Sequence, residues 1–121
     1  MSDSTDTNIL QRIEAAGRKV LPMHEFLVQN APKTFDAFDQ FLMHSIYRGD
    51  GLSAAHKEMV LACVCVVAGS AAPVIENHCR RALAAGLPKD HLLQAMEITA
   101  AVLATRTLAS GVNAVMAAGA K

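Results

Sequence analysis

The sequence contains few aromatic residues: no tryptophan, one tyrosine and four phenylalanines among 121 residues. Its β-branched residues do not gather into the alternating runs that predict strands. Alanine, leucine and methionine, which favour helices, are frequent instead. The composition therefore predicts an all-α protein.

Long blocks of like charge are also missing. Eleven basic residues balance eleven acidic ones, and there is no basic stripe of the kind that nucleic-acid binders carry. The longest apolar run, Met59 to Ala68, is shorter than the roughly 20 residues that a membrane-spanning helix needs. We therefore expect neither a nucleic acid nor a membrane as a partner.

The chain lacks the marks of a secreted protein. Residues 1–8 are polar and acidic, without the basic and then apolar segments of a signal peptide. The three cysteines are an odd number, which argues against a disulfide framework. We expect a disordered tail over residues 1–8, a single domain over residues 9–121, and a cytoplasmic location.

Apolar residues are abundant, at 52% of the chain. A domain of this length has one core and buries a limited share of its surface. Part of the apolar surface must therefore face another molecule. We expect that molecule to be a second subunit, so that the protein is a homo-oligomer.

Glycines, prolines and capping residues divide the chain into six to seven helices. Ser53 is a favourable N-cap, and Gly86 suits the residue after a helix end. The almost absent loop between the fourth and fifth helices predicts a central antiparallel hairpin. The fourth helix is apolar on every side after its first turns, which predicts that it is fully buried. The predicted helices cover residues 9–20, 23–29, 32–46, 53–68, 73–85, 88–105 and 108–118.

His78 is the most notable polar residue of the predicted hairpin. It shares an apolar helical face with Val74, Ile75 and Ala82. An unpaired histidine is costly there. One interpretation is a core histidine bonded to a backbone carbonyl, and the other is a proton donor or electrophile at the edge of a pocket.

The remaining candidates lie on the same two helices. Glu58 is either a solvated first-turn carboxylate or a partner of His78, and His56 and Lys57 are either surface residues or ligand contacts. The cysteines, Cys63, Cys65 and Cys79, are interpreted as small core residues. No metal or cofactor is expected, because the five histidines are scattered and no metal-binding or phosphate-binding motif is present.

Two segments together resemble the carboxymuconolactone decarboxylase and AhpD-like family. Residues 51–62 read GLSAAHKEMVLA and residues 75–86 read IENHCRRALAAG. The family typically has leucine-serine, then lysine-glutamate, an apolar helix, and a histidine that opens an alanine-rich helix ending in glycine. Pro32, Phe35 and Phe38 also resemble the entry to the family's domain. The resemblance runs from Pro32 to the end, and it implies the AhpD-like helical fold.

The redox branch of that family depends on two cysteines that this chain lacks. AhpD-like disulfide reductases carry Cys-x-x-Cys-x-x-x-His. Counted back from His78, the cysteine positions hold Ala71 and Val74; counted from Glu58, they hold Ser70 and Pro73. Thiol peroxidase chemistry needs a thiolate at these positions, so we do not expect that activity.

The decarboxylase branch also lacks the cysteine pair, and the resemblance to it implies a carboxy-lyase. In this interpretation His78 is a general acid or electrophile and Glu58 orients it, while Arg81 or Lys57 anchors a substrate carboxylate and His56 lies within reach. The branch's aromatic-glycine-tryptophan-proline segment is absent, since residues 100–108 read AAVLATRTL. The substrate, a small lactone or enolisable acid, therefore stays open.

Two other functions remain open, and the resemblance also bears on assembly. One is an AhpD-like redox or peroxide-defence protein that uses Cys79 or Cys63 in an atypical arrangement. The other is a non-catalytic member of the family. For the assembly, the resemblance implies a homotrimer or homohexamer.

Overall fold

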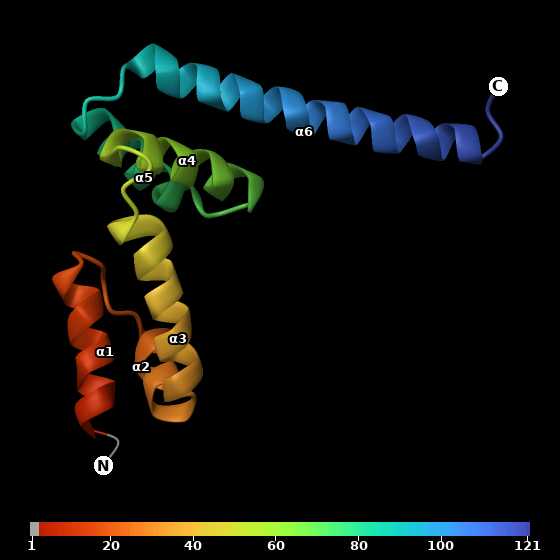
Figure 1. Ribbon diagram of the computed structural model, residues 1–121. Helices are drawn as coiled ribbons and strands as arrows, with labels where there is room; N and C mark the ends of the chain where they lie inside the picture. Colours follow the sequence, from red (N-terminus) through yellow and green to blue (C-terminus); the bar gives the residue numbers. More distant parts are fainter. Residues whose placement is uncertain (1–2) are drawn as a thin grey trace. The chain divides into compact units, whose positions relative to one another are not determined.

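The computed structural model describes residues 3–121, with side chains from Asn8 onward, and every regular element in this part of the chain is helical (Figure 1). This confirms the all-α prediction. The contacts divide the chain into two compact units, one ending at Gly51 and the other covering Leu52–Lys121. The predicted single domain over residues 9–121 stays a prediction. The elements are α1 (Asp3–Ala15), α2 (Pro22–Asn30), α3 (Pro32–Leu42), the π-helical segment η1 (Met43–Arg48), α4 (Ala54–Val67), α5 (Ala72–Ala84) and α6 (Lys89–Ala117).

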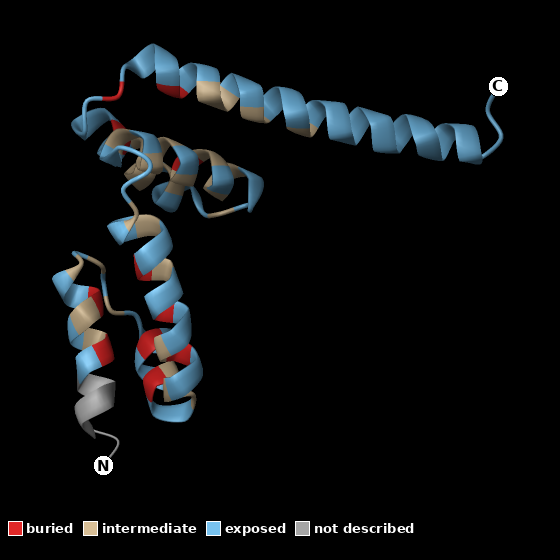
Figure 2. Ribbon diagram, in the orientation of Figure 1, coloured by how far each residue is buried: buried red, intermediate tan, exposed pale blue. Residues whose placement is uncertain are grey.

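The first unit packs α1, α2 and α3 around a small apolar core. Pro22 and Pro32 stand in the first turns of α2 and α3, where the missing N–H costs little. Figure 2 shows the buried residues of these helices facing one another. The core consists of Ile9, Ile13, Val28 and Phe35, with Leu10, Val20 and Leu27 packed against it.

A buried carboxylate, that of Asp39, links α1 to α3. Its side chain is only 1% exposed, and it accepts hydrogen bonds from Arg12 Nε at 3.0 Å and Arg18 Nη1 at 2.7 Å. Burial acts to raise the pKa of Asp39, but the hydrogen bonds and charges of Arg18 and Arg12 outweigh it and lower the pKa. Arg12 also contacts Asp36, at 2.6 Å. This cluster was not predicted from the sequence.

His24 is buried beside the same cluster. Its Nδ1 accepts the backbone N–H of Leu21 at 3.0 Å, and its ring stacks on Phe35 with 5.6 Å between centroids. Burial, and then the charge of Arg18, lower the pKa of His24, while Asp39 opposes them. The folded chain therefore favours the neutral form of the ring.

Acid should destabilise the first unit in two steps. Above pH 6.5, the ordinary pKa of His24, the ring is neutral in both the folded and the unfolded chain. Below pH 6.5 the unfolded chain takes up the proton first. The free energy of unfolding therefore decreases as the pH falls. Asp39 adds a second loss below its ordinary value of 3.8. Urea unfolding, monitored by circular dichroism at a series of pH values, would measure both decreases in the free energy of unfolding. His24→Gln should remove the first step, and the exposed control His44→Gln should leave it; equal pH profiles for both variants would contradict this assignment.

The second unit is built on the α4–α5 hairpin. The Ser53 side chain caps α4 by accepting the backbone N–H of His56 at 3.2 Å. Gly69 ends the helix with φ of 73°, a conformation that residues with a Cβ rarely adopt. The chain then turns directly into α5. The predicted hairpin is thus present, and its core contains Ala82, Leu87 and Leu92, with Ala55, Met59, Cys79 and Met96 packed against them.

Three predicted features of the helices differ from the structure. The prediction that α4 is fully buried is wrong: only Ala62 is buried, and Val60, Val64 and Val67 are 45–58% exposed. The reason is that α5 and α6 cover only part of its circumference. The predicted break between residues 105 and 108 is also wrong, because Arg106 and Thr107 do not interrupt a helix and α6 runs unbroken.

The third difference concerns the N-terminus. The first helix begins at Asp3 rather than Ile9 and ends at Ala15, so it covers most of the segment that was expected to be a disordered tail. Once Ile9 and Ile13 anchor a helix in the core, each preceding residue extends it by one hydrogen bond, without a new nucleation step. Residues 1 and 2 of the expected tail lie outside the described residues.

Candidate functional site

Glu58 and His78 form a side-chain hydrogen bond across the hairpin. The distance from His78 Nδ1 to Glu58 Oε2 is 2.7 Å, and each side chain is 18% exposed. A carboxylate oxygen accepts, so Nδ1 donates, and Nε2 is left for another partner. The contact forms because the hairpin places the beginning of α4 against the middle and end of α5. Sequence spacing had left this contact open.

Arg81 lies one turn after His78 on α5 and faces the same carboxylate. Its Nη1 is 3.9 Å from Glu58 Oε1, and its side chain is 47% exposed. At that distance and exposure the ion pair adds little stability. The guanidinium therefore keeps most of its donors in reach of solvent or a ligand. The i, i+3 spacing of His78 and Arg81 indicates this shared face in the sequence.

The two other predicted ligand contacts occupy the first turn of α4. The exposed His56 ring lies with Nδ1 2.9 Å from the Ser53 hydroxyl, so it takes part in the helix cap. Lys57 is half-buried beside Glu58. The structure thus brings Glu58, His78 and Arg81 together, and it places His56 at the helix entrance.

The cysteines lie in the second unit, and Cys79 has Cys63 near it. Cys63, Cys65 and Cys79 are all half-buried free thiols. Burial, followed by the neighbouring Cys63, raises the pKa of the Cys79 thiol. A raised pKa keeps the sulfur protonated, whereas reactive cysteines have lowered values. Among the described side chains, no group of three or more histidine, cysteine or acidic residues could hold a metal ion.

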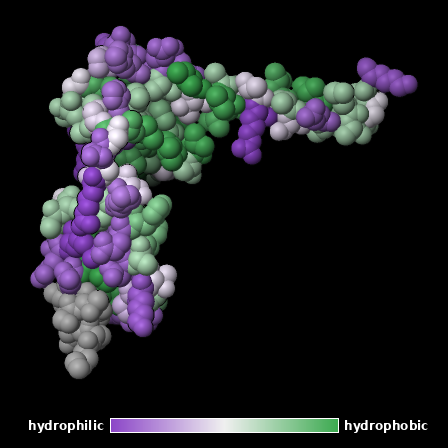
Figure 3. Space-filling view, in the orientation of Figure 1, coloured by the Kyte–Doolittle hydropathy of each residue, from purple (hydrophilic) through white to green (hydrophobic). Residues whose placement is uncertain are grey.

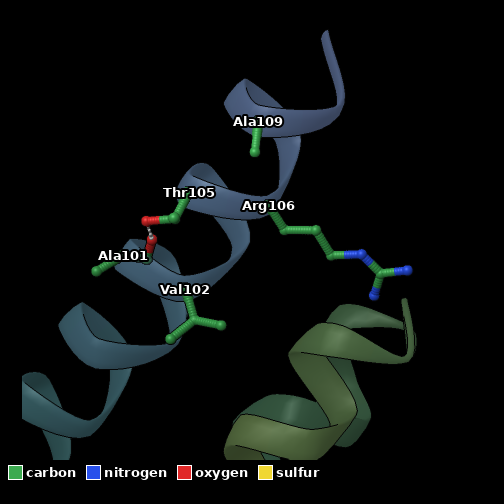
Figure 4. A pocket seen from close by; sticks show the side chains of 5 residues that line it. All are labelled: Ala101, Val102, Thr105, Arg106 and Ala109. Carbon is green, nitrogen blue, oxygen red and sulfur yellow. Dashed lines mark hydrogen bonds between the residues drawn. The ribbon is translucent and has the colours of Figure 1, made fainter. Parts of the chain in front are cut away.

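An open hollow lies along α6. Figure 4 shows it along one side of the helix, with Arg106 reaching out from its edge and the Thr105 hydroxyl donating to the Ala101 carbonyl at 2.7 Å. The expected pocket beside His78 stays a prediction. The residues that line the hollow are Ala101, Val102, Thr105, Arg106 and Ala109.

Comparison with known proteins identifies the family. The sequence profile of the carboxymuconolactone decarboxylase family matches residues 32–118, which is more than half of the chain and includes Glu58, His78 and Arg81. Neither curated proteins nor solved structures give a match. The match agrees with the helical hairpin and with the two sequence segments that resemble the family. The chain therefore belongs to the carboxymuconolactone decarboxylase family.

Proposed function

We propose that the protein is a lyase that removes carbon dioxide from a small carboxylated lactone or a similar enolisable acid. The observation that carries this proposal is the Glu58–His78 pair, 2.7 Å apart and partly shielded from solvent. Membership of the family supports decarboxylation as the reaction class. The absence of cysteine at residues 70, 71, 73 and 74 favours this branch over disulfide reduction.

The reaction requires a group that stabilises a developing negative charge and then donates a proton. When the bond between the carboxylate and the ring carbon breaks, its electron pair moves through the conjugated system to the lactone oxygen, and carbon dioxide leaves. The resulting dienolate must then gain a proton on carbon. A protonated His78 donates through Nδ1 to Glu58 and through Nε2 to the substrate, either to the developing oxyanion or to carbon.

Two positively charged side chains near the pair can bind the carboxylate of the substrate. Arg81 carries a half-exposed guanidinium beside the pair, and its planar fork suits a carboxylate. Lys57 lies on the same turn as Glu58 and offers a second positive charge. In this proposal they hold a substrate carboxylate while Glu58 orients the histidine. No metal or organic cofactor enters the mechanism.

Release of carbon dioxide from carboxymuconolactone tests the proposal. We expect the purified protein to produce carbon dioxide and the decarboxylated lactone. Proton NMR measures the formation of the lactone product. Glu58→Gln should lower the rate by about tenfold or more, since it removes the charge that supports the protonated ring. Glu76→Gln is the matched control, because Glu76 is exposed and pairs with Arg80 on its own helix. No release from this substrate or related lactone acids, or equal rates for both variants, would refute the proposal.

We also propose that the protein acts as a homo-oligomer, a trimer or a hexamer. Large apolar side chains stay exposed on α4 and over most of α6 in the single chain. Figure 3 shows apolar surface on the α4–α5 hairpin and along α6. Burying this surface would stabilise an assembly by the hydrophobic effect.

A further inference from the structure

We propose that α6 pairs with α6 of a second copy in antiparallel orientation, through a stripe centred near residue 107. This surface goes beyond the proposed activity and does not depend on it. A twofold contact joins two trimers into a hexamer, so the pairing selects the hexamer from the two assemblies proposed above. The stripe is made of Ile98, Val102, Thr105, Ala109, Val112 and Met116.

The spacing of the stripe is that of a helix–helix seam. Its members follow one another at intervals of four, three, four, three and four residues. Alternating steps of three and four keep side chains on one face of a helix, as the core positions of a coiled coil do. Ile98, Val102, Val112 and Met116 are 46–64% exposed in the single chain. The stripe lies on a different side of α6 from Leu92, which packs into the core of the hairpin.

The order of large and small residues reads the same in both directions. Counted from residue 107, Ile98 mirrors Met116, Val102 mirrors Val112, and Thr105 mirrors Ala109. Two antiparallel copies of such a helix place large residues opposite large ones and small residues opposite small ones. Self-complementarity of this kind is what a twofold contact between identical chains requires. It favours a second copy over an unrelated partner.

The hollow on α6 coincides with the small residues at the centre of the stripe. Thr105 and Ala109 line it together with Val102, and Figure 4 shows the short side chains of these three residues on α6. Small side chains at a crossing point allow two helix axes to approach closely. The hollow is therefore where the second helix would come nearest.

The length of α6 leaves its own hairpin unable to cover the stripe. At 1.5 Å per residue, the 29 residues of α6 span about 43 Å, whereas the 14 residues of α4 span about 21 Å. Figure 1 shows the C-terminal half of α6 extending past the α4–α5 hairpin. Every residue from Ala104 onward is exposed. The α4–α5 hairpin therefore leaves this half uncovered.

A lipid bilayer is the competing environment. By length and composition α6 is long and apolar enough to cross a membrane. However, Arg106 lies in the C-terminal half, with Thr105 and Thr107 beside it, and a charge within a bilayer is expensive. In an antiparallel pair, Arg106 lies at the edge of the seam, where the guanidinium reaches water. These residues favour the protein partner.

Charge substitutions at mirrored positions test the pairing and its direction. Val102→Lys and Val112→Glu, each alone, should lower the molar mass from light scattering by about twofold, because they place a charge in a twofold contact. The double variant V102K/V112E should restore the mass, since lysine then faces glutamate across the antiparallel pair. Thr107→Lys with Ala114→Glu is the control of equal charge on the opposite side of α6, and it should keep the wild-type mass. Circular dichroism checks that each variant stays helical.

A crosslink tests the contact without relying on dissociation. In the variant T105C/A109C, the two cysteines face each other across the pair, so oxidation should give a covalent dimer on a non-reducing gel. T107C/A114C, on the opposite side, should not. Wild-type mass in the single-charge variants, a double variant that stays dissociated, or a missing crosslink would each overturn the proposal. Flotation of the wild-type protein with neutral phosphatidylcholine vesicles would also overturn it and assign α6 to the membrane.

Discussion

Replacing His78 with asparagine should lower the rate of carbon dioxide release by about 100-fold or more, as expected for the loss of a general acid. Asparagine can still donate to Glu58, so the carboxylate that His78 contacts at 2.7 Å keeps a hydrogen-bond partner. What it loses is a group that can pick up and deliver a proton. The effect should fall mainly on kcat, because the substitution leaves Arg81, the proposed anchor of the substrate carboxylate, in place.

The control for this variant is His91→Asn. His91 is exposed near the beginning of α6 and belongs to the same unit, so its replacement should leave the rate unchanged. Helix content and molar mass of both variants should match the wild type. If His78→Asn unfolded the hairpin, or if kcat stayed within a few-fold of the wild-type value, His78 would be a structural residue and the proposed chemistry would lose its acid.

Replacing Asp39 with alanine should lower the free energy of unfolding of the first unit by about 3–5 kcal/mol. The carboxylate is 1% exposed and holds two arginines, Arg12 and Arg18, whose side chains are only 17% and 15% exposed. Without Asp39, two positive charges remain close together and poorly solvated. The decrease in the free energy of unfolding is therefore larger than the net contribution of the ion pairs themselves. Urea unfolding followed by circular dichroism measures it.

Asp36→Ala is the matched comparison. Asp36 also contacts Arg12, at 2.6 Å, but its side chain is 39% exposed, so solvent can replace the lost contact. Its removal should cost less than about 1 kcal/mol. If the two alanine variants were destabilised equally, burial would not be the cause of the large effect. An unchanged unfolding midpoint for Asp39→Ala would show that the network does not stabilise the fold.

The sequence alone was sufficient for the helical class, the hairpin and the family. Ser53, Gly69 and Gly86 act on the backbone next to them, so their effects on helix ends can be predicted from local sequence. The family pattern likewise consists of residues along the chain. The predicted first helix ran on to residue 20, although Gly17, with φ of 73°, marks its end locally. At Arg106 the error was the opposite one: no glycine or proline stands there, and α6 continues through the predicted break.

Tertiary structure alone decided which polar groups meet. Glu58 and His78 are 20 residues apart, and their contact depends on the rotation of two helices about their axes, which periodicity constrains only loosely. Asp39 stands in α3 as one more acidic residue, and only the packing of α1 brings Arg12 and Arg18 to it. Burial of α4 was wrongly predicted for a related reason: hydrophobicity shows that a face avoids water, but the chain's own helices determine whether that face is covered within one subunit.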